Sequence, residues 1–234
     1  MFDGSAAATV LAVVSGKGGV GKSIIATNLA LTWARTGSRV ALVDADVGQS
    51  SCPFLLGQGS EVRLVTAPDH LVNAPSEALS ALDCELASLK TTCDFVVVDA
   101  PAGIGLGVQW ALDRADASLL VLVDEPTAAA DAYSLCKMIW TLDPDYPLAG
   151  VVNMTDTQEE ATHVIARFSA LTHHFLDRKI LYGGWVPFSG EIRRSVRKQI
   201  PAVNTSPFVA DVFQGLSARV RCGVFETRIP VAMN

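Results

Sequence analysis

The chain is constrained most by a glycine-rich stretch near its start, which reads SGKGGVGKS over residues 15–23. An apolar run at residues 9–14 precedes it and predicts a buried strand, while residues 24–35 repeat apolar side chains at helical spacing. Glycines let backbone N–H groups approach an anion closely, and a helix N-terminus adds unpaired N–H groups and a positive dipole end. The order of strand, glycine turn and helix therefore predicts a phosphate-binding loop.

The spacing inside this loop satisfies the pattern G-x-x-x-x-G-K-[ST] in full. In that pattern, Lys22 reaches the β- and γ-phosphates of a nucleoside triphosphate, and the Ser23 hydroxyl ligates Mg²⁺. The residues expected to bind the nucleotide here are Gly16, Lys17, Gly18, Gly19, Val20, Gly21, Lys22, Ser23 and Ile24.

A second pattern, G-x-G-x-x-G, fits the same loop and is typical of dinucleotide binding, with Asp44 at about the right distance to hold a ribose. The Lys-Ser pair after the last glycine serves a triphosphate with magnesium and has no evident use for a pyrophosphate bridge. Lys17 adds a second cation, and a later strand ends at Asp99, where a carboxylate near magnesium belongs. These three features favour the triphosphate.

Acidic residues end two further apolar strands, at residues 39–44 and 95–99. Asp44 and Asp46 are spaced i, i+2 and project to one side of the first strand end, so one can interact with the magnesium shell and the other can orient a water. After Asp99, Gly103 allows a peptide N–H to turn toward a γ-phosphate. The simpler alternative is that these acids cap helices or lie solvated in turns.

The bulk composition fits one α/β domain, because 234 residues are enough for a large core and parallel strands account for 50% hydrophobic residues. We expect a lead-in at 1–8, the domain at 9–221 and a short tail at 222–234. A net charge of −6 does not indicate a broad DNA-binding face. The five cysteines lack any C-x-x-C pair, which indicates buried thiols in a reducing, cytoplasmic setting.

The run KGGVGKS from Lys17 to Ser23 resembles the signature of the deviant P-loop ATPases, the SIMIBI-class superfamily of MinD, ParA, the nitrogenase iron protein and FlhG. The resemblance implies a doubly wound, mostly parallel β-sheet flanked by helices. It also implies slow ATP hydrolysis with Mg²⁺ and an ATP-dependent homodimer, in which Lys17 crosses to the nucleotide of the partner subunit.

The same resemblance assigns roles to residues outside the loop. Asp46 matches the hydrolysis aspartate, and the run APAGI after Asp99 is similar to switch II of the family. Asn153 would pair with the adenine edge, and Pro187 and Phe188 would lie against the base. The implied catalytic residues are Lys17, Lys22 and Asp46. The implied metal ligands are Ser23, Asp44 and Asp99.

Residues 125–133, EPTAAADAY, are similar to the MinD/FlhG branch more than to ParA proteins. This similarity implies a spatial regulator of flagellar number or placement, or of the division site, with partners in that machinery. Within the stretch, Thr127 is expected to cap a helix. The alternatives are a ParA-like ATPase that partitions DNA or cargo, and an ATPase that delivers metal or Fe–S clusters.

Two segments near the end of the chain bear on partners. Residues 191–198 predict a basic helix, which is either a solvated face or a surface for an acidic partner, anionic lipid or DNA. The tail lacks the basic amphipathic helix with which MinD and FlhG proteins dock on membranes. We therefore expect at most weak, peripheral contact with the inner face of the cell membrane.

Overall fold

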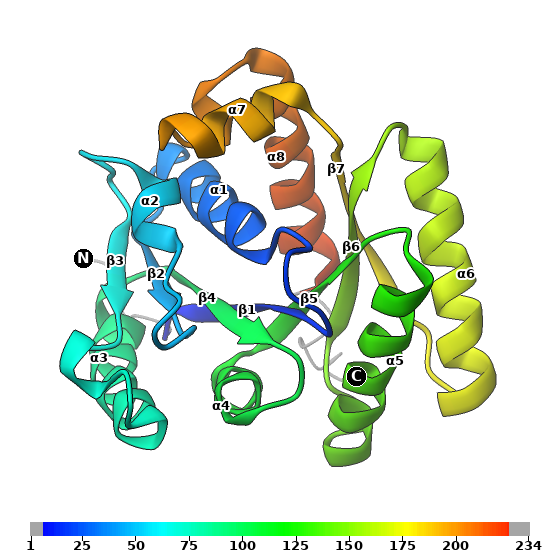
Figure 1. Ribbon diagram of the computed structural model, residues 1–234, viewed down its shortest axis with the longest axis horizontal. Coiled ribbons are helices and arrows are strands. Elements are labelled where there is room, and N and C mark those ends of the chain that lie inside the picture. The colour runs from blue at the N-terminus through cyan, green and yellow to red at the C-terminus, as the bar shows by residue number, and fades with distance from the viewer. Residues whose placement is uncertain (1–6, 225–234) are drawn as a thin grey trace, which may run out of the picture.

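The computed structural model describes residues 7–224 and is built around a seven-stranded sheet in the order β3-β2-β4-β1-β5-β6-β7 (Figure 1). All neighbouring strands run parallel, so the expected doubly wound fold is confirmed, with a fully parallel sheet. The strands are β1 (Thr9–Ser15), β2 (Val40–Asp44), β3 (Arg63–Thr66), β4 (Phe95–Ala102), β5 (Ala117–Leu122), β6 (Leu148–Thr155) and β7 (Leu181–Pro187).

Helices cover both faces of the sheet because alternate strand residues point to opposite sides. In β1, Leu11 and Val13 pack in the core under α1, α2, α7 and α8, whereas Val10, Ala12 and Val14 pack under α3, α4, α5 and α6. The helices are α1 (Lys22–Arg35), α2 (Cys52–Leu56), α3 (Pro75–Thr92), α4 (Leu106–Arg114), α5 (Pro126–Leu142), α6 (Gln158–Leu176), α7 (Gly190–Lys198) and α8 (Pro207–Arg219). Three shorter helical turns are η1 (Asp69–Leu71), η2 (Ala202–Asn204) and η3 (Val220–Val224).

The inner strands are buried along nearly their whole length, which explains their continuous apolar sequences, whereas the edge strand β3 is buried only at Val65. Every residue of β2 and β5 is buried. A strand covered by helices on both faces has no side that favours polar residues. The buried parallel strands are thus the source of much of the high hydrophobic content.

The strand register brings the predicted site residues of neighbouring strands together. Asp99 of β4 lies opposite Asp44 of β2 on one side and opposite Val13 of β1 on the other. From central β1, the chain builds β2, β3 and β4 on one side and then β5, β6 and β7 on the other. In sheets of this kind, ligands bind beyond the carboxyl ends of the strands, where the direction of winding reverses.

The described chain begins with a short segment that is held against the end of α3. Ala8, at the end of the expected lead-in, is buried, and its N–H donates to the Lys90 carbonyl at 2.9 Å. Residues 1–6, and nearly all of the tail at 222–234, lie outside the described residues. Across residues 7–224, no helix has both the length and the apolar character needed to cross a bilayer.

The packing of α5 generates a stability prediction. Leu135 is 0% exposed, whereas Leu142 on the same helix is 72% exposed. Leu135→Ala should lower the free energy of unfolding by about 2–5 kcal/mol, because it leaves a cavity in the core. Leu142→Ala is the matched control and should change it by less than about 0.5 kcal/mol. Urea unfolding followed by circular dichroism measures both, and equal losses would contradict this assignment of the core.

Candidate phosphate-binding site

The glycine loop connects β1 directly to α1, as predicted. Gly21 precedes the first helical residue with φ +92°, and Gly19 has φ +79°, both in the left-handed region that favours glycine. The Gly18 and Gly19 backbone is exposed, while Lys22 is buried at the start of the helix. The loop therefore presents backbone amides and a helix N-terminus at the carboxyl edge of the sheet, which is the arrangement that binds phosphate.

A close backbone contact anchors the loop to α5. A Cβ atom added to Gly16 would lie 2.2 Å from the carbonyl carbon of Asp131 and 2.5 Å from the amide nitrogen of Ala132. Both are backbone atoms, which cannot rotate away as a side chain can. The start of the loop is thus fixed against the second turn of α5, and only glycine fits there.

Asp44 organises the loop that follows β2. Its Oδ1 accepts from the Asp46 backbone N–H at 3.1 Å, and its Oδ2 accepts from the Ser50 hydroxyl at 2.7 Å and from the Cys52 backbone N–H at 3.1 Å. These three bonds fold residues 45–52 around a buried carboxylate. In this conformation Asp44 positions the loop that carries Asp46, and its expected role as a metal ligand stays a prediction.

Asp99 lies beside Asp44 and is less well satisfied. The Cys52 thiol donates to its Oδ2 at 3.3 Å, while its Oδ1 is buried and has no hydrogen-bond partner among the described residues. Burial raises the pKa of Asp99 to about 7. A buried carboxylate oxygen with no partner is expensive to leave unpaired, so this atom is suited to a cation or its water shell.

Cys52 completes this buried group. The sequence analysis did not predict a role for this cysteine. Ligand atoms of Asp44, Cys52 and Asp99 lie within 4.8 Å of one another. Burial, followed by the nearby Asp99 and Asp44 carboxylates, raises the pKa of the Cys52 thiol, so it remains protonated and serves as a hydrogen-bond donor. Because Mg²⁺ prefers oxygen ligands, the two carboxylates and the Ser23 hydroxyl fit this ion, and the thiol does not.

Lys22 and Asp46 form the charged border of the same group. Burial lowers the pKa of the Lys22 ammonium, and the neighbouring Asp99 and Asp46 carboxylates oppose that shift. The pKa of Asp46 is raised by burial and then by Asp44, while Lys22 opposes it. The site thus brings the predicted phosphate lysine close to both predicted acids, and Asp46 remains partly exposed where a ligand could reach it.

Lys17 points away from its own loop and contacts the start of α5. Its Nζ donates to Glu125 Oε2 at 2.9 Å and to the Thr127 hydroxyl at 3.2 Å. The expectation that Thr127 caps the helix is wrong, because the helix begins at Pro126 with Glu125 in the cap position. The Thr127 hydroxyl accepts from Lys17 instead.

Asn153 and the turn after β7 lie on the other side of the loop. The Asn153 amide donates to the Val20 carbonyl at 2.8 Å, so the strand-end residue contacts the phosphate loop directly. Pro187 is buried at the end of β7, and Phe188 is 62% exposed beside it. Met154, which sequence reasoning did not select, is 46% exposed with φ +63°. The roles of Asn153, Pro187 and Phe188 toward a base stay predictions.

Gly103 lies close to the loop but is not free to bind a phosphate in this conformation. Its N–H donates to the Ser15 carbonyl at 2.9 Å, and its φ is +91°. Contact between this N–H and a ligand would require that bond to break. The bond also joins the segment after β4 to Ser15, the last residue of β1 before the glycine loop.

Comparison with known proteins gives consistent findings. A family model described as ParA, NUBPL iron-transfer P-loop NTPase, matches residues 6–91. The antiactivator FleN of Pseudomonas aeruginosa is 32% identical over 219 residues, which cover 81% of this chain and 77% of FleN. The flagellum site-determining protein YlxH of Helicobacter pylori is 27% identical, covering 85% and 76%. The MinD structure from Pyrococcus horikoshii with Mg-ADP superposes with a TM-score of 0.73 at 22% identity, covering 91% and 96%, and supports the fold.

The contact between Gly16 and α5 predicts an effect on stability. Gly16→Ala should lower the free energy of unfolding by about 1–3 kcal/mol, because the new methyl group overlaps fixed backbone atoms. Gly18→Ala is the control, since a Cβ there meets no atom within 4 Å. Thermal unfolding of the ligand-free protein measures both. Equal melting temperatures for the two variants would show that the loop is not anchored at Gly16.

Proposed function

The chain belongs to the MinD/ParA family of P-loop ATPases, and on this basis we propose that it is an ATP-dependent dimeric switch of the MinD/FlhG kind. Its output is the regulation of flagellar number or placement, or of the division site. The similarity to FleN and YlxH over most of the chain favours the flagellar output.

The observation that carries this proposal is the meeting of four elements at one edge of the sheet. The glycine loop, the loop held by Asp44, Asp99 of β4 and the segment at Gly103 are linked by register and by hydrogen bonds. The expected strand end at Asp99 is wrong, because β4 continues to Ala102. A switch needs such links, because the state of a bound nucleotide must alter segments that a partner can contact.

The placement of the charges supports ATP hydrolysis at this site. Lys22 would stabilise negative charge on the β- and γ-phosphates, and Asp46 would orient the attacking water. Ser23 and Asp99 would hold Mg²⁺, with Asp44 nearby, and the bound ion would neutralise phosphate charge. Turnover is expected to be slow, because the dimer is the signal and hydrolysis resets it.

The contacts of Lys17 give the monomer a resting arrangement. In the family, this lysine crosses to the nucleotide of the partner subunit, whereas here it is paired within its own chain with Glu125 and Thr127. We infer that this pairing competes with dimer formation. Lys17 is 41% exposed and Glu125 is 59% exposed, so the competition is modest.

Two other outputs remain alternatives. The description of the matching family model names iron transfer. Within the described chain, however, three cysteines are buried, namely Cys52, Cys93 and Cys136. The two exposed cysteines, Cys84 and Cys222, have no metal-binding spacing in sequence. Purified protein that carries stoichiometric iron would favour that alternative.

An ATP-dependent, salt-sensitive complex with DNA would favour the ParA-like alternative. Peripheral membrane contact stays a separate proposal, tested by liposome sedimentation with ATP and with ADP.

The first test of the switch separates binding from hydrolysis. Lys22→Ala should abolish binding of a fluorescent ATP analogue, because it removes the cation at the phosphates. Asp46→Ala should bind ATP, lose most phosphate release and accumulate as a dimer in light scattering with ATP. Leu142→Ala, exposed and remote from the loop, is the control. An Asp46→Ala protein that releases phosphate at the wild-type rate would remove Asp46 from the mechanism.

The second test concerns the pairing of Lys17. Glu125→Gln in an Asp46→Ala background should tighten the ATP-dependent dimer about two- to fivefold, the effect of removing an exposed ion pair from the monomer. Asp124→Asn is the control, because Asp124 pairs with Arg167 instead. Sedimentation equilibrium measures the dimer constant. A weaker dimer in Glu125→Gln would mean that Glu125 supports Lys17 in the dimer rather than competing with it.

A further inference from the structure

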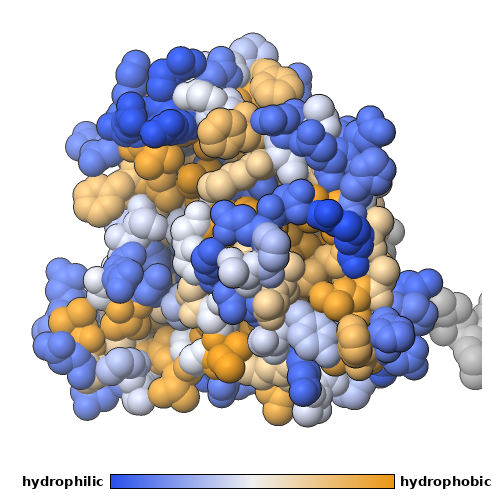
Figure 2. Space-filling model, turned by 45° about the vertical axis from the view of Figure 1, so that its right-hand side comes forward, coloured by the Kyte–Doolittle hydropathy of each residue, from blue (hydrophilic) through white to orange (hydrophobic). Residues whose placement is uncertain are grey.

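The basic helix α7 has an unusual electrostatic environment. Ile192 and Ser195 anchor one side of the helix in the protein, and the basic residues lie exposed on the other. Figure 2 shows hydrophilic side chains gathered at the top of the molecule, where α7 lies in Figure 1. The four cations are Arg193, Arg194, Arg197 and Lys198.

These cations have no partners among the described residues, unlike the other arginines there. Each of those contacts a carboxylate, a backbone carbonyl or an aromatic ring. They are Arg35, Arg39, Arg63, Arg114, Arg167, Arg178, Arg219 and Arg221. The one acid within α7, Glu191 in its first turn, accepts from the Ser206 hydroxyl rather than from a cation. On a chain of net charge −6, this local excess of positive charge favours an anionic ligand.

A groove runs beside the cations. A cavity of about 240 Å³ is lined by Arg194 and Lys198 of α7 and by one acid, Glu191, whose carboxylate is bonded to Ser206. The cations therefore outnumber the acids at this wall. A second cavity of about 390 Å³ extends from the end of α7 to α1 and the segment after α2. The two cavities share Ile200 and Asn204 in their walls, so they adjoin along one line. We call this line the α7 groove.

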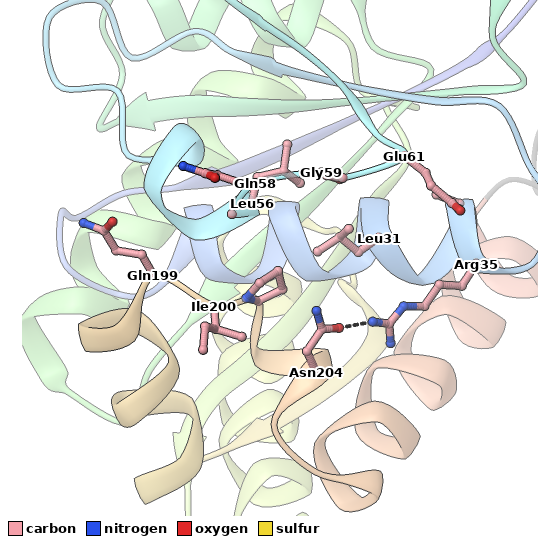
Figure 3. Close-up of a pocket in the computed structure, with 13 residues that line it drawn as sticks. Leu31, Arg35, Leu56, Gln58, Gly59, Glu61, Gln199, Ile200 and Asn204 are labelled. Atoms are coloured by element: carbon pink, nitrogen blue, oxygen red, sulfur yellow. Dashed lines mark hydrogen bonds between the residues drawn. The ribbon is translucent and has the colours of Figure 1, made fainter.

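Figure 3 shows the second part of the groove. Gln199 and Ile200 extend from the end of α7 on one side, and Leu31 and Arg35 come from α1 on the other. The Arg35 guanidinium donates a hydrogen bond to the Asn204 side chain, which holds these two lining residues together. The groove is therefore charged at its α7 end and partly apolar at its α1 end.

Apolar side chains around the cations distinguish between kinds of anionic ligand. Ile200 is 42% exposed and Val196 is 39% exposed, and Phe208 at the start of α8 is also exposed. Nucleic acid is held chiefly through many phosphate contacts, and a single helix with four cations offers few. Apolar anchors bordered by arginine are typical of surfaces that bind protein.

We propose that the α7 groove binds an acidic segment of a protein partner. Carboxylates of the segment lie against Arg194 and Lys198, and an apolar side chain of the segment packs on Ile200. This surface is separate from the phosphate-binding site, so the proposal does not depend on ATP hydrolysis.

The test measures anisotropy of a fluorescein-labelled peptide rich in glutamate and leucine, added to the full chain. Binding is expected, and added salt should weaken it. The double variant Arg194→Glu, Lys198→Glu should weaken it roughly tenfold or more, because it reverses the charge facing the carboxylates. The control is Lys137→Glu, Lys179→Glu, which makes the same change in net charge at two exposed lysines elsewhere and should bind as the wild type does.

Parallel titrations with duplex DNA and with phosphatidylglycerol vesicles complete the experiment. Peptide binding that is lost in the α7 variant and kept in the control supports the proposal. A peptide that does not bind, or binds both variants equally, overturns it. Loss of DNA or vesicle binding in the α7 variant, with no peptide binding, also overturns it and assigns the helix to a nucleic acid or lipid surface.

Discussion

The site depends on the register of three adjacent parallel strands. Asp44 ends β2 opposite Asp99, and Asp99 lies opposite Val13, while β4 and β1 continue to Ala102 and Ser15, which lie opposite each other. The segments that leave these three neighbouring strands are therefore adjacent at one edge of the sheet. Because side chains alternate along a strand, a slip of one residue would turn a carboxylate to the other face of the sheet. Core packing on both faces prevents that slip, so the apolar interior also determines the chemistry at the edge.

Placing Asp44 and Asp99 side by side in a buried environment creates an electrostatic imbalance. Asp44 is stabilised by three hydrogen bonds from its own loop, whereas Asp99 accepts from the Cys52 thiol and leaves one oxygen unpaired. Buried carboxylates without full compensation favour protonation or a nearby cation. Lys22 supplies part of the positive charge, and a divalent ion would supply the rest. The nucleotide and its metal would thus stabilise a group that the protein alone leaves incomplete.

Much of this arrangement could be predicted from the sequence, since the strong signals are local. Apolar runs identified the strands, and the loop pattern placed Lys22 and Ser23 directly before a helix, which in the structure begins at Lys22. The pairing of Lys17 with Glu125 could not be predicted, because it joins loops that are 108 residues apart. Cys52 was missed for a similar reason: it belongs to no cysteine pair, and its position beside Asp99 arises only when residues 45–52 fold around Asp44. Thr127 illustrates the opposite error, in which a local capping preference gave way to a tertiary contact.

The close contact at Gly16 limits how the site can move. Since the first residue of the loop is fixed against the α5 backbone, Lys17 can reach a second subunit only by rotating its own side-chain bonds. Rotations of exposed side chains take picoseconds to nanoseconds, far less than loop or domain rearrangements. Once the bond to Glu125 is broken, movement of the ammonium group would therefore be fast compared with assembly. In the proposed dimer, the pace of assembly would then depend on how often two loaded molecules meet, and the response of the switch would depend on the abundance of the protein in the cell.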